Sequence, residues 1–248
     1  MKSISLILLF INPVICFTQS LDLKNYEDYM PTSNCGEIIH YNYYSISFCE
    51  EYKLSEWTIH YLTPDKLGTQ KRTNDFRKDP QLNGRDASLS DFKGSGYDRG
   101  HMVPAGDMTY NKTSMSESFF MTNISPQLPN FNRGAWKEIE IQIREWVKEY
   151  DTVAIITGAI HEKYPKKITR WVGDSLPVPN YFYKIFIDIQ RKKSIAFLMP
   201  NKKITREIDD YIISIRELEK RTGLDFFYKL NNRDEKLLEK ESNIYGGH

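Results

Sequence analysis

The stretch YFYKIFIDIQRKKSIAFLMP, residues 181–200, decides the class of fold. Two runs rich in β-branched and aromatic residues, 181–189 and 194–199, flank the polar tetrapeptide Gln190-Arg191-Lys192-Lys193. Two such runs joined by a short polar segment predict a β-hairpin. The hairpin indicates a sheet in which neighbouring strands run antiparallel.

Outward from this hairpin, the chain alternates irregularly between predicted strands and helices. Further strands are predicted for residues 43–48, 57–62, 119–122 and 152–160, and helices for 136–147 and 207–221, with Gly223 as the stop signal of the second helix. Residues 64–96 are polar and rich in turn-forming residues, which predicts a long irregular connection. Because strands and helices do not strictly alternate, we expect an α+β fold, a single domain with a central, mostly antiparallel sheet flanked by helices.

The first twenty residues differ from the rest of the 248-residue chain. A short positive start is followed by an almost wholly apolar run from Ile4 to Phe17, and then by small residues before Leu21. This pattern predicts a signal peptide over residues 1–20, a mature domain over 21–248, and a secreted or periplasmic protein that has no membrane contact after cleavage. The alternative is an uncleaved N-terminal anchor, for which the apolar run is short.

Bulk charge does not indicate a nucleic-acid partner. The chain has 34 basic and 33 acidic residues, and removal of residues 1–20 takes away one lysine and no acid, so the mature chain has no net charge. A phosphate-binding surface would therefore be local. The candidate basic clusters are Lys163, Lys166, Lys167 and Arg170; Arg191, Lys192 and Lys193; and Lys202, Lys203 and Arg206, each of which could also be a solvated turn.

Two of the three cysteines, Cys35 and Cys49, lie outside the predicted signal peptide. In an oxidising compartment they could form a disulfide, worth roughly 3 kcal/mol by closing a short loop. The alternative is two free buried thiols. Their spacing does not fit a zinc site.

The residues that carry chemistry are concentrated between Tyr97 and Glu140. His101 is a candidate general base, since a neutral imidazole is the usual base near neutral pH. Arg99 lies two residues before it and suits a phosphate. Asn132 and Glu140 offer the oxygen ligands that Mg²⁺ prefers. If a helix begins near Asn132, the two lie about 80° apart around its axis and about 12 Å along it, so Asn132 would bind the ion directly and Glu140 through a water.

Each of these residues also has an ordinary structural explanation. His101 could be a structural or surface histidine, Arg99 could pair with Asp98 or Asp107, and Asn132 could be a helix N-cap, a position that asparagine favours. Glu140 could belong to a solvated helix face.

Taken together, the residues resemble a known family. Tyr97-Asp98-Arg99-Gly100-His101-Met102-Val103-Pro104-Ala105 is similar to the signature of the DNA/RNA non-specific endonucleases, the ββα-metal group that includes endonuclease G. A second block, Asn123-Ile124-Ser125-Pro126-Gln127 followed by Asn132, Trp136 and Glu140, matches in type and spacing. A looser resemblance covers about residues 57–230. It implies a ββα-metal motif within the α+β fold.

The resemblance implies a role for each matched position. His101 activates the attacking water, Asn132 is the direct ligand of one Mg²⁺ (or Mn²⁺ in its place), and Glu140 orients a water on that ion. Arg99 contacts the scissile phosphate, and Asn123 supports the site. The implied reaction is cleavage of DNA and RNA without sequence specificity, with 5′-phosphate products, and homodimers are compatible with the family.

A further phosphate-binding arginine is expected upstream of the first block. Both Arg72 and Arg77 are candidates, of which Arg72 is preferred, and the local register leaves the choice open. Two other functions are compatible with the residues. One is a nucleic-acid binding module without activity, and the other is a phosphodiesterase or phosphatase for a smaller substrate.

Overall fold

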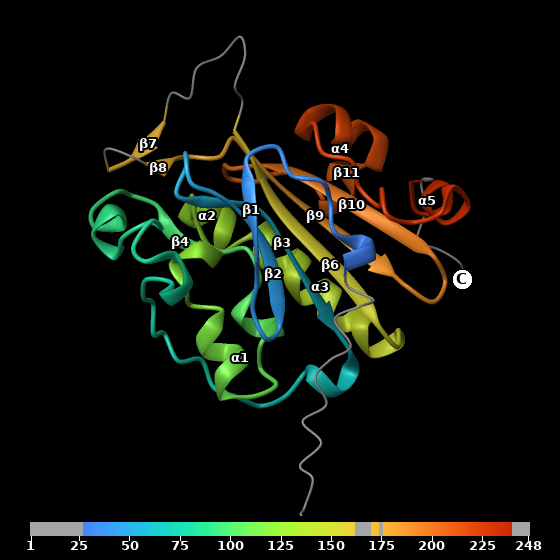
Figure 1. Ribbon diagram of the computed structural model, residues 1–248, viewed down its shortest axis with the longest axis horizontal. Coiled ribbons are helices and arrows are strands. Elements are labelled where there is room, and N and C mark those ends of the chain that lie inside the picture. The colour runs from blue at the N-terminus through green and yellow to red at the C-terminus, as the bar shows by residue number, and fades with distance from the viewer. Residues whose placement is uncertain (1–26, 162–169, 174–175, 240–248) are drawn as a thin grey trace, which may run out of the picture.

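The computed structural model describes residues 27–161, 170–173 and 176–239. The predicted signal peptide and the lysines at 163, 166 and 167 lie outside these ranges. Seven strands form one antiparallel sheet in the order β1-β2-β3-β6-β9-β10-β11 (Figure 1). Their bounds are β1 Gly36–His40, β2 Tyr44–Cys49, β3 Leu54–Leu62, β6 Val153–Ile160, β9 Tyr181–Asp188, β10 Lys193–Pro200 and β11 Ile212–Ile213.

Helices cover both faces of this sheet, which is the predicted α+β architecture. On one face, α3 (Ala135–Glu149) packs through Trp136, Ile139 and Ile143 against side chains such as Phe182 and Phe186 of β9. On the other face, α4 (Ile215–Thr222) and α5 (Asn232–Glu239) pack against the alternate residues of the same strands, including Tyr183 and Ile185 (Figure 1). Successive side chains of a strand point to opposite faces, so β9, which is apolar on both faces, separates two cores.

The hairpin predicted from residues 181–200 is confirmed. β9 and β10 pair antiparallel from Tyr181 opposite Pro200 to Asp188 opposite Lys193. The helix predicted for 136–147 is confirmed as α3, and the strands predicted for 43–48, 57–62 and 152–160 are confirmed as β2, β3 and β6. Gly223 ends α4 with φ of 72°, a left-handed conformation that glycine adopts without a steric cost.

Three predicted elements differ in the structure. Residues 119–122 are not a strand, because a 3₁₀ turn at Met121–Asn123 precedes β5 (Ile124–Gln127). The helix predicted from 207 begins only at Ile215, because Ile212 pairs with Phe197 in the sheet and the Ser214 side chain accepts the Glu217 amide hydrogen.

The third difference concerns the helix expected to begin near Asn132. A short helix, α2 (Pro129–Asn132), ends there, and α3 starts at Ala135. Gly134 separates them with non-helical angles of φ −102° and ψ −121°. A Cβ at Gly134 would lie 2.7 Å from the Asn130 carbonyl oxygen, so the sharp break requires a glycine. Asn132 therefore belongs to a separate helix from Glu140, and it is not the N-cap of α3.

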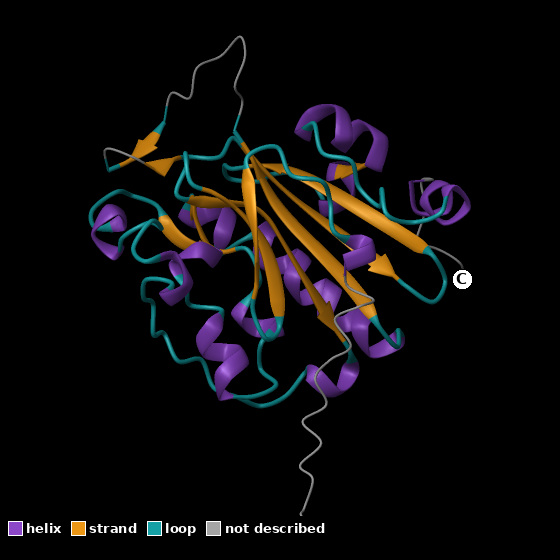
Figure 2. Ribbon diagram, viewed as in Figure 1, coloured by secondary structure: helices purple, strands orange, loops and turns teal. Residues whose placement is uncertain are grey.

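The predicted long connection between β3 and the first motif block is confirmed. Residues 64–97 contain only short 3₁₀ helices, namely Pro64–Lys66, Pro80–Leu82 and Leu89–Phe92. Figure 2 shows this part of the molecule as loops and single helical turns beside the sheet. Helix α1 (Lys112–Glu117) follows the first block, and a small hairpin, β7 (Trp171–Val172) with β8 (Leu176–Pro177), packs through Val172 and Leu176 onto β5.

Cys35 and Cys49 form a disulfide. Cys35 immediately precedes β1, and Cys49 is the last residue of β2. Cys49 lies opposite Gly36, the first residue of β1. The bond therefore fastens the edge strand of the sheet to its neighbour. Of the described residues, no helix is both long and apolar enough to cross a membrane.

Candidate active site

A two-stranded hairpin, β4 (Asp98–His101) with β5 (Ile124–Gln127), joins the two sequence blocks. The register places Asp98 opposite Gln127 and His101 opposite Ile124, and α2 with Asn132 follows directly. Gly100 is required at this crossing because a Cβ there would lie 2.2 Å from Cδ of Gln127. The hairpin and the helices after it form the ββα arrangement expected from the resemblance.

His101 is buried at the end of β4. Its exposed fraction is 8%, and its ring lies between Phe76, at 5.5 Å, and Phe119, at 4.9 Å between ring centroids. Among the described residues no group forms a hydrogen bond with its buried Nε2. A buried polar atom without a partner is rare unless it has a function or a water to bind.

The surroundings of His101 keep its imidazole neutral. Burial lowers its pKa, the positive charges of Arg72 and Arg99 lower it further, and a backbone hydrogen bond at Arg99 acts in the opposite direction, so the pKa falls to about 3. A neutral imidazole has a lone pair on one ring nitrogen, which is what a general base requires.

We expect this neutral histidine to make the protein less stable in acid. Between pH 6.5 and about 3, the unfolded chain binds a proton at His101 and the folded chain does not, so the free energy of unfolding falls as the pH falls, by up to about 1.4 kcal/mol per pH unit. Urea unfolding of the wild type and of His101→Asn at pH 7 and pH 5 measures the difference. The variant should lose less stability than the wild type, and equal losses would contradict the buried neutral state.

Asn123 holds the backbone that follows His101. Its Oδ1 accepts a hydrogen bond from the Val103 amide at 2.8 Å, and its Nδ2 donates to the carbonyl oxygens of Val103 and Ser118 at 2.9 and 2.8 Å. The backbone carbonyl of Asn123 also accepts from the amide of Met102. The side chain is fully buried and its hydrogen bonds are internal, so it fixes the backbone next to His101.

Arg99 and Arg72 flank His101 and rest on aromatic rings. The guanidinium carbon of Arg99 lies 4.1 Å from the centroid of Phe76, and that of Arg72 lies 4.8 Å from the centroid of Phe119. Arg99 is not paired with Asp98 or Asp107, since those carboxylates bind other arginines. Both arginines are exposed, and apart from the Nε of Arg72, which donates to Oδ1 of Asn74 at 2.7 Å, their donors are accessible to a phosphate.

Arg77 has a different environment from Arg72. Its Nη1 donates to the Asp75 carboxylate at 2.9 Å and to the Ser116 carbonyl at 2.9 Å, and its guanidinium lies over Phe120. The backbone of Arg77 also forms a β-bridge with Phe120, and its amide donates to the carbonyl oxygen of Phe119. The charge of Arg72, in contrast, acts on both His101 and Glu140.

Asp98 fastens Asn132 to β4. The Nδ2 of Asn132 donates to Oδ2 of Asp98 at 2.9 Å, and Arg133 donates to both carboxylate oxygens of Asp98 at 2.6 and 2.8 Å. The hydrogen bond through Nδ2 leaves the Oδ1 of Asn132 available to a ligand. These hydrogen bonds and the Arg133 charge hold the pKa of Asp98 below its usual range.

Glu140 lies partly buried in the first half of α3. Burial raises the pKa of its carboxyl well above the usual value, and the negative charge of Asp107 also raises it. The positive charges of Lys184, Arg144 and Arg72 lower the pKa, and that of Lys184 has the largest lowering effect. Lys184 is itself fully buried on β9. The carboxylate is thus surrounded mainly by cations.

The residues present fit a hydrated Mg²⁺. Over the described ranges, no group of three or more histidine, cysteine, aspartate or glutamate side chains could hold an ion. One amide oxygen on Asn132 with one carboxylate on Glu140 is instead the kind of sparse oxygen donor set that suits Mg²⁺, which keeps most of its waters.

The sequence did not indicate a buried ionic chain beside the site. His60 is bonded to Asp107 at 3.0 Å, and Asp107 is bonded to Arg144 at 2.7 Å. Asp107 belongs to the first block and Arg144 lies one helical turn after Glu140. That spacing is a signal that could have identified Arg144. The aromatic residues Phe76 and Phe119 were also missed, because only the folded chain brings them to His101.

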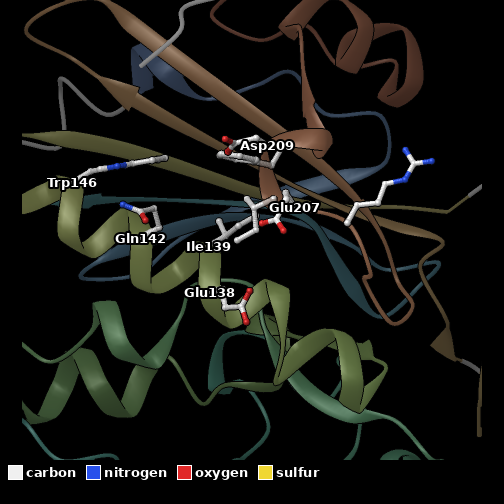
Figure 3. Close-up of a pocket in the computed structure, with 9 residues that line it drawn as sticks. Glu138, Ile139, Gln142, Trp146, Glu207 and Asp209 are labelled. Carbon is white, nitrogen blue, oxygen red and sulfur yellow. The ribbon is translucent and has the colours of Figure 1, made fainter. Parts of the chain in front are cut away.

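Some members of the other basic clusters have local partners in the described part of the chain. Arg191 pairs with Asp188, and Lys192 pairs with Asp234. Arg206 lines a pocket of about 380 Å³ between α3 and residues 206–209, together with the carboxylates of Glu138, Glu207 and Asp209 (Figure 3). Three carboxylates repel phosphate, so this pocket does not suit a nucleic-acid backbone.

Comparison with known proteins identifies the class to which this fold and site belong. Residues 22–233 match the model of the DNA/RNA non-specific endonuclease family. The chain belongs to this family.

Individual relatives agree with this assignment. Nuclease C1 of Cunninghamella echinulata var. echinulata is 32% identical over 206 residues, which cover 76% of this chain and 81% of that protein. The mitochondrial nuclease EXOG of Mus musculus is 29% identical over 209 residues, and human mitochondrial endonuclease G is 28% identical over 185 residues. The matched regions cover 77% and 68% of this chain, but only 57% and 62% of those two relatives.

A solved structure has the same fold. A chain in the crystal structure of the EndoG/EndoGI complex, described as a mechanism of EndoG inhibition, superposes with a TM-score of 0.76 and 25% sequence identity. The superposition covers 86% of this chain and 93% of that chain. The likeness includes the large antiparallel sheet and the few helices of the present structure.

Proposed function

We propose that this protein is a Mg²⁺-dependent endonuclease that hydrolyses phosphodiester bonds of DNA and RNA without sequence specificity and leaves 5′-phosphate ends. The observation that carries the proposal is His101, a buried neutral histidine whose Nε2 has no hydrogen-bond partner among the described residues and which lies between two exposed arginines. A base next to phosphate-binding groups is the arrangement that phosphodiester hydrolysis requires.

The site residues divide the reaction among them. His101 accepts a proton from a water molecule as its oxygen forms a bond to phosphorus, and the bond from phosphorus to the 3′ oxygen breaks. The leaving oxygen takes a proton from solvent and becomes a 3′-hydroxyl. Arg99 and Arg72 bind the phosphate oxygens and stabilise the charge that develops on them.

Asn132 and Glu140 would hold Mg²⁺, Asn132 directly and Glu140 through water. When bound, the ion supplies Lewis-acid stabilisation of the phosphate and of the leaving oxygen. Asp98 orients Asn132 through its hydrogen bond, and Asn123 keeps His101 in position. Contacts to phosphate carry no sequence information, which supports cleavage without base specificity. Acceptance of RNA further requires that the 2′-hydroxyl is not read.

Cleavage of plasmid DNA and of RNA by the purified chain without residues 1–20 tests this function. With Mg²⁺ both substrates should be cut, and EDTA should stop the reaction. The product ends should accept labelled phosphate from a kinase only after phosphatase treatment. A chain that leaves both polymers intact but hydrolyses a chromogenic phosphate ester would have a small-molecule substrate, and one that binds DNA without cutting it would be a binding module.

The choice between the two upstream arginines gives a second test. We expect Arg72→Ala to lower the cleavage rate by about 10²-fold, since one donor to the developing charge is lost. Arg77→Ala should keep the rate within a few-fold, but should destabilise the fold by about 1–3 kcal/mol because the acceptors on Asp75 and Ser116 lose their donor. Cleavage rates and urea unfolding of both variants measure these effects, and the reverse pattern would assign the phosphate to Arg77.

We also propose that residues 1–20 are a signal peptide and that the mature protein is secreted or periplasmic. The disulfide between Cys35 and Cys49 supports export, because disulfides persist in oxidising compartments. Expression in a bacterial host followed by N-terminal sequencing of the exported protein is the test. Leu21 should be the first residue, and a full-length protein retained inside the cell would contradict the proposal.

A further inference from the structure

Lys184 is a fully buried lysine on the side of β9 that faces α3. Its neighbours on that side, Phe182 and Phe186, pack in the core beneath α3, whereas Tyr183 and Ile185 pack in the opposite core. The side chain of Lys184 has an exposed fraction of 0%. Burial of an ammonium group costs several kcal/mol unless opposite charge and hydrogen bonds compensate, so this position demands an explanation.

Two contacts hold the ammonium group at the underside of α3. The Nζ donates to Oγ1 of Thr157, on the adjacent strand β6, at 2.6 Å. It also lies 4.8 Å from the centroid of the Trp136 ring, the first large side chain of α3. Trp136 and Glu140 are four residues apart on this helix, so they lie on the same face, one turn apart. The ammonium is therefore on the face of α3 that carries Glu140.

Glu140 is the acidic group that acts most strongly on Lys184, and Asp107 is the next. Asp107 already has two cationic or polar partners, Arg144 at 2.7 Å and His60 at 3.0 Å. In return, Lys184 is the positive charge that acts most strongly on Glu140. Lys184 and Glu140 are thus each other's principal counter-charge.

We propose that Lys184 is a positioning residue of the candidate metal site, and that its anchored ammonium attracts the Glu140 carboxylate and holds it in place for the hydrated ion. This inference rests on the proposed function, because it concerns the same site. Lys184 does not contact the substrate, and it acts only through Glu140.

The sign of the effect distinguishes this role from simple charge repulsion. An ammonium near Mg²⁺ repels it, so removal of the Lys184 charge would by itself strengthen Mg²⁺ binding. If Lys184 acts through Glu140, its removal weakens Mg²⁺ binding instead, and the weakening disappears when Glu140 is neutral. A double-mutant cycle separates these two contributions.

The experiment is a Mg²⁺ titration, followed by calorimetry, of the wild type, Lys184→Met, Glu140→Gln and the double variant. We expect Lys184→Met to weaken Mg²⁺ binding about tenfold when Glu140 is present, the usual size of an effect on a group that supports a ligand. In the Glu140→Gln background, the same change should leave the affinity unaltered or increase it. Lys148→Met is the matched control, because it removes an exposed lysine that pairs with Glu145 on the same helix.

Lys184→Gln is the second test variant, since a glutamine amide keeps a donor for Thr157 without the charge. Circular dichroism checks the fold of each variant. Equal weakening in both backgrounds, or no weakening in either, overturns the inference and leaves the nuclease proposal intact if the wild type binds Mg²⁺ and cuts DNA. A wild-type chain that binds no Mg²⁺ overturns the metal site itself, and the role of Lys184 with it.

Discussion

Replacement of His101 with alanine should lower the rate of plasmid cleavage by about 10²–10⁴-fold, the contribution of a general base. The structure supports this magnitude because, among the described residues, only the imidazole of His101 combines burial, two flanking arginines and an Nε2 without a hydrogen-bond partner. Conversion of supercoiled plasmid at saturating Mg²⁺ is the measurement.

The matched control for this prediction is His40→Ala, which removes an exposed imidazole on β1 that bonds to Ser45. It should cut at the wild-type rate. Because the alanine variant leaves a space between Phe76 and Phe119, added imidazole should restore part of the activity of His101→Ala. A folded His101→Ala protein that cuts as fast as the wild type would remove His101 from the mechanism.

Replacement of Asn132 with alanine should have the second large effect. It removes the proposed ligand atom Oδ1 and should lower the cleavage rate by about 10²–10³-fold, because a bound ion would contribute several kcal/mol of transition-state stabilisation. It should also weaken Mg²⁺ binding in calorimetry. The fold should persist, since the Asp98 carboxylate, which loses the Asn132 donor, keeps both hydrogen bonds from Arg133.

Asn130→Ala is the control for Asn132, since both residues belong to α2 and the Asn130 side chain is exposed. It should preserve both Mg²⁺ binding and cleavage. Asn132→Asp keeps an oxygen ligand but places a second carboxylate beside Asp98, so we expect an activity between those of the wild type and Asn132→Ala. Undiminished cleavage by Asn132→Ala would show that the ion is held elsewhere.

Local sequence patterns predicted the parts of the fold that depend on neighbouring residues. The hairpin at 181–200, the helix carrying Trp136 and the glycine stop at 223 follow from period, composition and backbone freedom, which are properties of short segments. The predicted strand at 119–122 and the long helix from 207 were wrong. A 3₁₀ turn replaces the end of the first, and sheet pairing of Ile212 with the Ser214 cap shortens the second.

The candidate site shows the same division. Two blocks of sequence were sufficient to select His101, Arg99, Asn132 and Glu140, because the spacing of these residue types is visible in the chain itself. Whether Arg72 or Arg77 lies beside His101 could not be decided from seven adjacent residues. The choice depends on Phe119, Phe120 and Ser116, which lie about forty residues away and meet these arginines only in the folded chain.

The sequence by itself thus determined the class of fold, the family resemblance and the candidate site residues. Only the tertiary structure decided their states: a neutral His101, an Asn132 oriented by Asp98, and a Glu140 under the influence of the buried Lys184 charge. The physical reason is that residue type sets what a group can do. Burial and nearby charge set its protonation and orientation, and these come from segments that are distant in the chain.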